Sequence, residues 1–568
     1  MNPVDDGLYG NLTYEQYLLE RKKGELKGIN QWKIEPTDPL PNEEIRIYFS
    51  TDFNTSKDRL TLYYTKDGSE PKEEDEKITL CLDKILWEDS LWNFIRIYKG
   101  TIPGQKENTI IRYRVEDDEK IYSFSVDNFS PPNWIDETVI YHIFVDRFAK
   151  GKRPVFYQDN LKAKWGGNLK GIVEHLDYIE SLGVNALWLS PIFKSPSYHG
   201  YDVIDYFEID PVKGTKEDLK ILVNKAFNKG IRIFLDFVPN HLSYLNPIFQ
   251  EALKNPESRY RKWFTFKENG YESFAGVKSM PKIDLRCKEA REYIIESAKY
   301  WIKNFNISGY RLDHANGPVL DFWTEYWFKI KNEFPDTFHF AEVIETPEKV
   351  KNFEGKLDGA LDFFLFKMTR EFFIGKKWNI EEFSNLLISK RLYFNPNFKM
   401  ISFLENHDSN RFLWVAKDKK ILKLALIFQF TQNEIPIIYN GTEIGANQYR
   451  DMLENGRSLH EYVRLPMIWD EKKQDLELFS FCKKLVNIRK KHPSLYKGEY
   501  IPFISLVFSF WKVFDKEKIL VLINQEENKK VINLPQGLVF KNLLDEKIYK
   551  DITSIPPKEG MILQVVNL

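Results

Sequence analysis

Between residues 139 and 439 the sequence alternates between short apolar runs and amphipathic segments of helical period. The runs are almost continuously apolar, which is typical of parallel strands that helices cover on both faces. Helical segments such as 169–182 and 216–229 separate them. Roughly eight strand–helix units of this kind predict a central (β/α)8 TIM barrel with insertions. The clearest apolar runs are 139–145, 184–189, 231–235, 338–341, 400–404 and 435–439.

The sequence on either side of this stretch has a different pattern. Residues 31–127 read as short alternating strands separated by turn residues, which predicts an antiparallel β-sandwich, with carbohydrate binding as one interpretation of its role. Short strands return beyond Pro493 and predict a small antiparallel β domain. We therefore expect a multidomain chain with a leader (1–30), an N-terminal β-sandwich (31–130), a catalytic barrel (131–495) with a short insertion (242–285), and a C-terminal β domain (496–568).

Charge and cysteine content exclude several classes of partner. The 82 basic and 83 acidic residues nearly cancel, so neither nucleic acid nor an anionic membrane is an expected partner. The three cysteines are far apart and suggest no disulfide framework, and no signal peptide or membrane-length apolar run is visible. We therefore expect a cytoplasmic protein. Abundant Lys and Glu are compatible with a thermophilic source, although an AT-rich genome gives a similar bias.

Polar clusters follow four of the predicted barrel strands. In a TIM barrel the active site lies at the carboxyl ends of the strands. One such cluster is more often structural than functional, but four at equivalent positions indicate a common site. The clusters are residues 236–241 (DFVPNH), 311–313 (RLD), Glu342, and 405–408 (ENHD).

Arg311 and Asp313 lie two residues apart, so on a strand their side chains share a face. An arginine beside an aspartate favours the ionised carboxylate. An oriented, ionised carboxylate is what a glycosidase nucleophile requires. Taken alone, the pair is better explained as a structural ion pair at a strand end, and it is the other clusters that favour the catalytic interpretation.

Together these segments resemble the conserved regions of the α-amylase family of retaining glycoside hydrolases (glycoside hydrolase family 13). The resemblance runs in the right order from about residue 134 to 495. Residues 280–284 (MPKID) are close to the MPKLN of the neopullulanase, cyclomaltodextrinase and maltogenic amylase group, which also has an N-terminal β domain. Further similar segments are 165–171 (WGGNLKG) and 199–202 (HGYD).

The resemblance implies a role for each matching residue. Asp313 would be the nucleophile, and Glu342 the general acid that then serves as the base for water. Asp408 would bind sugar hydroxyls and stabilise the transition state. Arg311 would hold Asp313 in place and ionised, and a structural role is expected for Asp236. The implied substrate-binding residues are Tyr201, Asp202, His241, Arg311 and His407, with Tyr201 stacking on the sugar.

Residues 314–317 (HANG) depart from the family pattern. Classical α-amylases often have Lys-His where Asn316 and Gly317 stand, and that histidine helps to bind calcium, whereas the neopullulanase group commonly has Glu in place of Gly317. Asn240 remains as a potential calcium ligand, but lysines after the first strand disfavour a cation. We expect no required cofactor, with calcium not essential and no metal ligand set assigned.

The resemblance implies hydrolysis of α-1,4-glucosidic bonds in maltooligosaccharides, cyclodextrins or related α-glucans through a covalent glycosyl-enzyme. A transferase or isomerase of the same family, such as a branching or trehalose-forming enzyme, is an alternative. A non-catalytic glucan-binding protein is an alternative of another class, which the three carboxylates disfavour. Linkage preference between α-1,4 and α-1,6 stays open, and in the resembling group a homodimer often completes the site.

Overall fold

The structure, a computed structural model, describes residues 14–566 except 56, 269 and 455, so part of the predicted leader lies outside the described residues. Helix α1 (Tyr14–Glu25) leads into a seven-stranded antiparallel sheet of order β1-β2-β5-β4-β3-β6-β7. Strand β4 pairs with β3 through its first half and with β5 through its second half, across a bulge near Leu82. The strands are β1 (Ile29–Glu35), β2 (Ile45–Thr51), β3 (Arg59–Thr65), β4 (Glu76–Glu88), β5 (Asn93–Ile102), β6 (Thr109–Val115) and β7 (Tyr122–Val126).

Because β4 joins the two halves of the sheet, the sheet folds over one main core, and a smaller cluster with Tyr48 and Ile95 lies apart from it. Apolar side chains of β1, β2 and β5 pack in the main core with those of β3, β6 and β7, among them Phe49, Leu62 and Tyr113. The predicted N-terminal β-sandwich is confirmed in this form.

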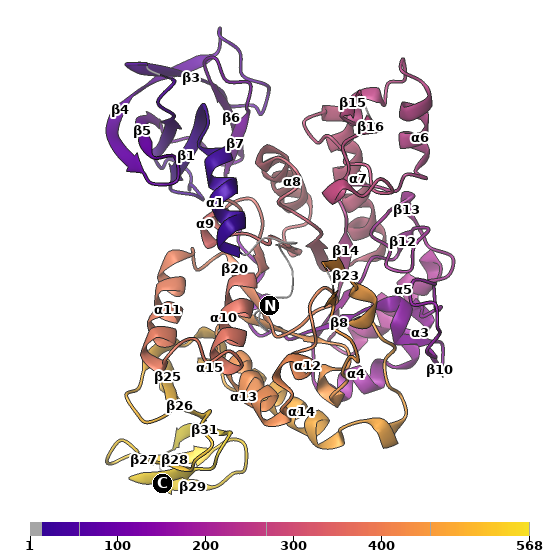
Figure 1. Ribbon diagram of the computed structural model, residues 1–568, viewed down its shortest axis with the longest axis vertical. Helices are drawn as coiled ribbons and strands as arrows, with labels where there is room; N and C mark the ends of the chain where they lie inside the picture. The colour runs from indigo at the N-terminus through magenta and orange to yellow at the C-terminus, as the bar shows by residue number, and fades with distance from the viewer. Residues whose placement is uncertain (1–13, 56, 269, 455, 567–568) are drawn as a thin grey trace.

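The predicted barrel is confirmed as a closed ring of eight parallel strands in the order β11-β14-β17-β18-β19-β20-β21-β8 (Figure 1). The apolar runs of the sequence coincide with six of these strands, since each strand is buried on both faces. The strands are β8 (Ile140–Ile143), β11 (Ala186–Leu189), β14 (Arg232–Phe237), β17 (Gly309–Leu312), β18 (Phe338–Ala341), β19 (Gly359–Leu361), β20 (Lys399–Phe403) and β21 (Ile435–Tyr439).

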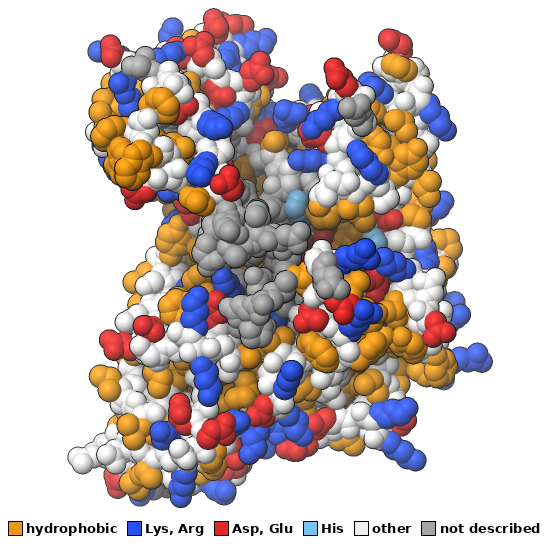
Figure 2. All heavy atoms as spheres, viewed as in Figure 1, with side chains coloured by type: hydrophobic (Ala, Val, Ile, Leu, Met, Phe, Trp, Pro, Cys, Tyr) orange, Lys and Arg blue, Asp and Glu red, His pale blue; other side chains and the backbone are white. Residues whose placement is uncertain are grey.

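Helices surround the barrel, and a short insertion leaves it between β14 and β17. The insertion contains α6 (Pro247–Lys254) and a small hairpin of β15 (Phe266–Lys267) and β16 (Gly270–Tyr271). It stands beside the barrel mouth, facing the N-terminal sheet across a hollow in the surface (Figures 1 and 2). The main outer helices are α3 (Leu169–Glu174), α4 (Leu176–Leu182), α5 (Lys216–Asn228), α7 (Lys288–Phe305), α8 (Leu320–Glu333), α10 (Phe363–Phe373), α11 (Ile380–Tyr393), α13 (Lys419–Phe430) and α14 (Leu476–Lys491).

The C-terminal antiparallel domain is confirmed as an eight-stranded sheet of order β24-β25-β26-β31-β28-β29-β30-β27. Phe508, Val521 and Ile562 on one of its faces belong to the same apolar core as barrel helix α13. The opposite face has a core of its own. The strands are β24 (Glu499–Pro502), β25 (Phe508–Phe514), β26 (Glu517–Asn524), β27 (Lys530–Asn533), β28 (Val539–Asn542), β29 (Ile548–Lys550), β30 (Ile552–Ile555) and β31 (Glu559–Val566).

Ion pairs fix the N-terminal sheet to the barrel. Arg112 of β6 contacts Asp321 and Glu325 of α8, at 2.9 and 2.7 Å. Arg291 of α7 contacts the same two carboxylates, each at 2.8 Å. The buried Arg291 and the half-buried Arg112 thus share two acids, so every charge in the group has an opposite charge beside it. None of the helices within the described part of the chain is both long and apolar enough to cross a membrane.

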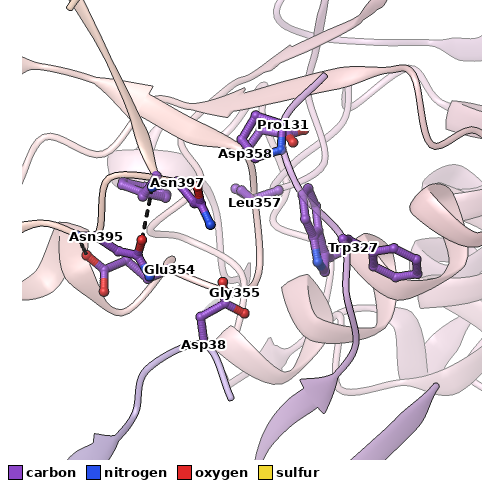
Figure 3. A pocket seen from close by; sticks show the side chains of 11 residues that line it. Asp38, Pro131, Trp327, Glu354, Gly355, Leu357, Asp358, Asn395 and Asn397 are labelled. Carbon is purple, nitrogen blue, oxygen red and sulfur yellow. Dashed lines mark hydrogen bonds between the residues drawn. The ribbon is translucent and has the colours of Figure 1, made fainter. Parts of the chain in front are cut away.

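A small pocket lies at this junction, near Asp38 of the N-terminal region and Glu354 of the barrel (Figure 3). Glu354 Oε1 accepts a hydrogen bond from the main-chain N–H of Asn395 at 2.8 Å. Burial, with the nearby charge of Asp127, raises the pKa of Asp38 to about 7. The pocket shares no residue with the strand-end clusters, so we assign it to the domain junction rather than to the active site.

We expect Gly309→Ala to destabilise the protein strongly. Gly309 opens β17 with φ at +138°, and a Cβ there would lie 1.9 Å from the Phe338 carbonyl oxygen. Backbone strain and the clash together predict a loss of about 3 kcal/mol or more in the free energy of unfolding. Thermal unfolding followed by circular dichroism measures it. Gly24→Ala in α1, where a Cβ has nothing within 4 Å, is the matched control, and equal unfolding temperatures for the two variants would contradict the expectation.

Candidate active site

The strand-end clusters meet around one buried guanidinium, that of Arg311. Its Nη1 lies 2.7 Å from Asp236 Oδ1 and 2.9 Å from Asp313 Oδ1, and its Nη2 lies 2.7 Å from Glu342 Oε1. The three carboxylates come from three neighbouring strands, β14, β17 and β18, whose ends the barrel closure brings together. The planar guanidinium holds its donors in a fixed fork that reaches three carboxylates at once, whereas the compact ammonium of a lysine has no such fixed geometry.

The register of the barrel strands determines where each of these side chains lies. Arg311 of β17 is paired with Asp236 of β14, so both point into the barrel at the same level. Asp313 and Glu342 each follow the last residue of a strand, and their main-chain N–H groups still donate to Phe237 and Leu312 of the neighbouring strands, at 2.8 and 2.9 Å. The ladder therefore continues through both residues and holds their side chains at the barrel mouth.

Asp236 is the most enclosed of the three carboxylates. Its Oδ2 accepts hydrogen bonds from Trp188 Nε1 and Tyr201 Oη, both at 3.0 Å, while Oδ1 contacts Arg311. Burial, opposed by the charge of Arg311, raises its pKa to about 6. Both carboxylate oxygens of Asp236 are thus bound by protein groups. We therefore assign Asp236 to orienting Arg311 and Tyr201, which is the structural role expected for it.

The charge balance of the cluster differs from the sequence-based expectation for Asp313. Burial raises the pKa of Asp313 well above its usual range, against the opposing charge of Arg311, and the carboxylates of Glu342 and Asp236 act in the same direction as burial. One cation shared among three carboxyl groups does not keep Asp313 ionised by itself. Arg311 thus only partly offsets the burial that opposes ionisation of Asp313, and a retaining mechanism needs the ionised form of its nucleophile.

Asp408 stands in the opposite electrostatic environment. Its Oδ2 lies 2.8 Å from His407 Nε2, and its Oδ1 contacts both His460 Nδ1, at 2.9 Å, and Arg464 Nη2. Although burial opposes it, His407 and Arg464 hold the pKa of Asp408 well below its usual range. Asp408 is therefore a permanently ionised carboxylate, suited to binding hydroxyl groups and to stabilising positive charge.

The remaining predicted binding residues lie around these two groups. The Tyr201 hydroxyl contacts His407 Nε2 and the two rings are parallel, 5.4 Å apart. His241 is buried with its ring on Phe274, and burial lowers its pKa to about 3. Asp202 accepts hydrogen bonds from Ser195 and Ser197 of its own loop, so its predicted substrate contact stays a prediction.

Two contacts of Asp408 were not expected from the sequence. His460 and Arg464 lie in the long loop after β21, more than twenty residues beyond the strand end, with no local polar motif. Arg464 also donates to the His407 carbonyl oxygen at 2.9 Å and to Tyr198 Oη at 3.1 Å. Only the position of this loop after the eighth strand could have pointed to them.

The residues around Asn240 do not fit the calcium site that the family resemblance implies. Asn240 Oδ1 is buried without a hydrogen-bond partner among the described residues, so it has the lone pairs of a ligand. However, its neighbours are His241, Gly317 and His314, which offer no carboxylate. Calcium prefers six to eight oxygen ligands including carboxylates. In the part of the chain that the structure describes, no group of three or more His, Cys, Asp or Glu side chains is arranged to hold a metal.

Comparison with known proteins adds independent findings. The α-amylase catalytic-domain family model matches residues 142–475. The chain is 52% identical over 564 residues to Alpha-amylase 2 of Dictyoglomus thermophilum, covering 98% of this chain and 99% of that one. It is 35% identical over 480 residues to a cyclomaltodextrinase of Geobacillus thermopakistaniensis, covering 78% and 79%. A solved cyclomaltodextrinase structure, 25% identical, superposes with a TM-score of 0.72 over 95% of this chain and 99% of that one.

We expect Arg311→Lys to lower kcat by about 100-fold while the protein stays folded, because a lysine lacks the fixed fork that holds the three carboxylates in place. Lysine keeps one positive charge, but its different length and shape place that charge farther from Asp313, so it opposes the effect of burial less. The pKa of Asp313 then rises further, so the acidic limb of the pH–rate profile moves to higher pH. Initial rates of glycan cleavage between pH 4 and 9 measure both effects.

Arg489→Lys is the matched control, since Arg489 is equally buried but donates to main-chain carbonyl oxygens away from the site. An unchanged pH profile in Arg311→Lys would contradict the proposed charge balance.

Proposed function

The chain belongs to the α-amylase family of glycoside hydrolases, and we propose that it hydrolyses α-1,4-glucosidic bonds of maltooligosaccharides and cyclodextrins through a covalent glycosyl-enzyme. It is an α-amylase-family glycosidase, close to the cyclomaltodextrinase, maltogenic amylase and neopullulanase group, and it acts on α-glucans. The non-catalytic alternative is therefore set aside. The observation that carries the proposal is the placement of Asp313 and Glu342 on one guanidinium, with the ionised Asp408 beside them.

The proposed reaction follows from this arrangement. Asp313 attacks the anomeric carbon while Glu342 gives its proton to the leaving oxygen, and the C–O bond to the departing sugar breaks. Glu342 then removes a proton from water, which attacks the same carbon and releases Asp313. In retaining enzymes the two carboxyl groups lie about 5–5.5 Å apart, which two carboxylates on one guanidinium can satisfy.

The sugar to be cleaved would lie against Asp408, His407 and Tyr201. Because Asp408 stays ionised, it can accept hydrogen bonds from sugar hydroxyls and favour the positively charged transition state over the ground state. The His407 ring, whose pKa burial lowers to about 4, is uncharged at neutral pH and can serve as donor or acceptor. Substrate binding and proton transfer would thus be carried by separate groups.

The finer properties are proposals of the same kind. The intracellular maltogenic amylase of Bacillus subtilis, 31% identical over 470 residues, supports a cytoplasmic location for this chain, and the three unpaired cysteines are compatible with it. The residues beside Asn240, which are His241, His314 and Gly317, offer no carboxylate, and this supports activity without calcium. A homodimer stays a prediction.

We expect the enzyme to release glucose and maltose from maltotriose, to open β-cyclodextrin, and to keep its activity when EDTA is present. Asp313→Asn removes the nucleophile while keeping its shape, so turnover falls by about 10⁴-fold or more. Product chromatography on maltotriose, β-cyclodextrin and pullulan measures this, with the exposed Asp83→Asn as the control.

Products longer than the starting maltotriose would instead identify a transferase. Activity lost on chelation would contradict the proposal about calcium, and full activity in Asp313→Asn would contradict the site.

A further inference from the structure

The loop that carries Tyr201 has a buried lysine against it. After β11 the chain forms a small hairpin of β12 (Phe193–Lys194) and β13 (Asp205–Ile209), and Tyr201 lies in the segment that joins these two strands (Figure 1). The Tyr201 hydroxyl contacts two other residues of the site, so the position of this loop determines whether those contacts form. Lys213 lies in the turn between β13 and α5 and is only 1% exposed.

Two close contacts join the Lys213 ammonium group to the loop. Nζ donates a hydrogen bond to the main-chain oxygen of Pro191 at 2.6 Å. A Cβ at Gly200 would lie 2.6 Å from Nζ and 2.6 Å from the same Pro191 oxygen. Gly200 has φ at +86° and immediately precedes Tyr201. The ammonium group therefore packs against the backbone one residue away from the tyrosine.

The main chain fixes the position of the lysine itself. The N–H of Lys213 donates to the Asp210 carbonyl oxygen, and its own carbonyl oxygen accepts from the N–H of Leu169, the first residue of α3, both at 2.8 Å. Asp210 Oδ2 accepts from Lys164 Nζ at 2.6 Å and from the N–H of Ser195 at 3.2 Å. The turn of Lys213 is thus bound to an outer helix of the barrel and to the start of the Tyr201 loop.

The charge of Lys213 also opposes that of Asp202, the acid of this loop. Burial raises the pKa of Asp202, and the hydrogen bonds from its own loop and the charge of Lys213 oppose that rise. In the described part of the chain, the basic group within ion-pair distance of Asp202 is His199, at 4.0 Å. Burial lowers the pKa of His199 well below its usual range, so this ring is uncharged at neutral pH. Lys213 therefore supplies the positive charge beside the loop.

The Lys213 ammonium group is charged at neutral pH but loses its proton more easily than a lysine in water. Burial lowers its pKa to about 8, and the surrounding acids oppose this change. The charged and titratable groups around it come from its own turn, from α2 (Val145–Phe148), from the loop after β8 and from the Tyr201 loop, and they are Asp210, Asp146, Lys164, Asp202 and His199.

We propose that Lys213 is a positioning residue, whose buried ammonium group holds the Tyr201 loop where the tyrosine contacts His407 and Asp236. Because Lys213 is shielded from the substrate, it acts through Tyr201 and not on the sugar. Without the ammonium group, the main-chain oxygen that it binds has no donor and the acid of the loop has no opposing charge, so the loop loses its anchor. This inference rests on the proposed function and adds to it the support of one wall of the site.

A double-mutant cycle tests whether Lys213 acts through Tyr201. Lys213→Met keeps an unbranched side chain but removes the charge, and kcat/KM for maltotriose falls about tenfold or more because the loop is misplaced. Tyr201→Ala removes the ring and lowers kcat/KM further. Adding Lys213→Met to Tyr201→Ala then changes kcat/KM by less than about threefold, since the residue to be positioned is already absent. Losses that multiply would overturn the inference.

The matched control is Lys356→Met. Lys356 is also buried, and burial lowers its pKa to about 8 as well, but it lies at the junction with the N-terminal region. We expect its kcat/KM to stay within about threefold of the parent enzyme in the folded protein.

The pH dependence distinguishes this role from a merely structural one. The substrate is α-maltosyl fluoride, because fluoride departs with little help from an acid and deprotonation of Glu342 then does not limit the rate at high pH. In the parent enzyme kcat/KM falls as the pH rises through about 8, where Lys213 loses its charge. Lys213→Arg stays charged and shows no such fall up to about pH 10. Lys213→Met has a low rate that does not fall further in this range.

An alkaline fall that is absent from the parent enzyme, or unchanged in Lys213→Arg, would overturn the inference, as would full activity in Lys213→Met. If Lys213→Met does not fold, as judged by circular dichroism, the comparison of the parent enzyme with Lys213→Arg decides. A parent enzyme that cleaves neither maltotriose nor α-maltosyl fluoride would instead overturn the proposed function.

Discussion

The buried guanidinium of Arg311 is the interaction on which the active site depends. It contacts Asp236, Asp313 and Glu342, which reach it from three neighbouring strands of the barrel. Closure of the eight strands is therefore what gathers the carboxylates, and strand register determines which of them share a level. With only one positive charge among three acids, Arg311 only partly offsets the burial that raises the pKa of Asp313, the proposed nucleophile.

The nearby carboxylate of Asp408 lies in the opposite electrostatic environment, and this contrast allows the carboxyl groups of the site to take different roles. Asp408 contacts three basic side chains, those of His407, His460 and Arg464, and stays ionised, whereas burial raises the pKa of Asp313. Carboxyl groups whose surroundings shift their pKa values in opposite directions can take different roles at one pH. Here Asp408 would bind the sugar and stabilise positive charge. Asp313 would form the covalent bond, and Glu342 would exchange protons.

Most of the fold could be predicted from the sequence, because continuous apolar runs mark strands buried on both faces. Strand β19 was the hardest to see, since it is only three residues long and has no run of its own. The polar clusters at strand ends located the central carboxylates, because the strand ends converge in a barrel. Contacts made by long connections could not be predicted in this way. Arg464 and Phe274 reach the site from a loop and an insertion, so no pattern at a strand end marks them.

The central claim is that Asp313 forms the covalent bond while sharing Arg311 with Glu342. Trapping the intermediate tests it most directly, because a fluorinated maltosyl fluoride forms the glycosyl-enzyme faster than water removes it. Peptide mass spectrometry after digestion then locates the added sugar. The account predicts a single adduct on the peptide that contains Asp313, and none in Asp313→Asn. An adduct on Asp236, Glu342 or Asp408, or inactivation without any covalent adduct, would contradict it.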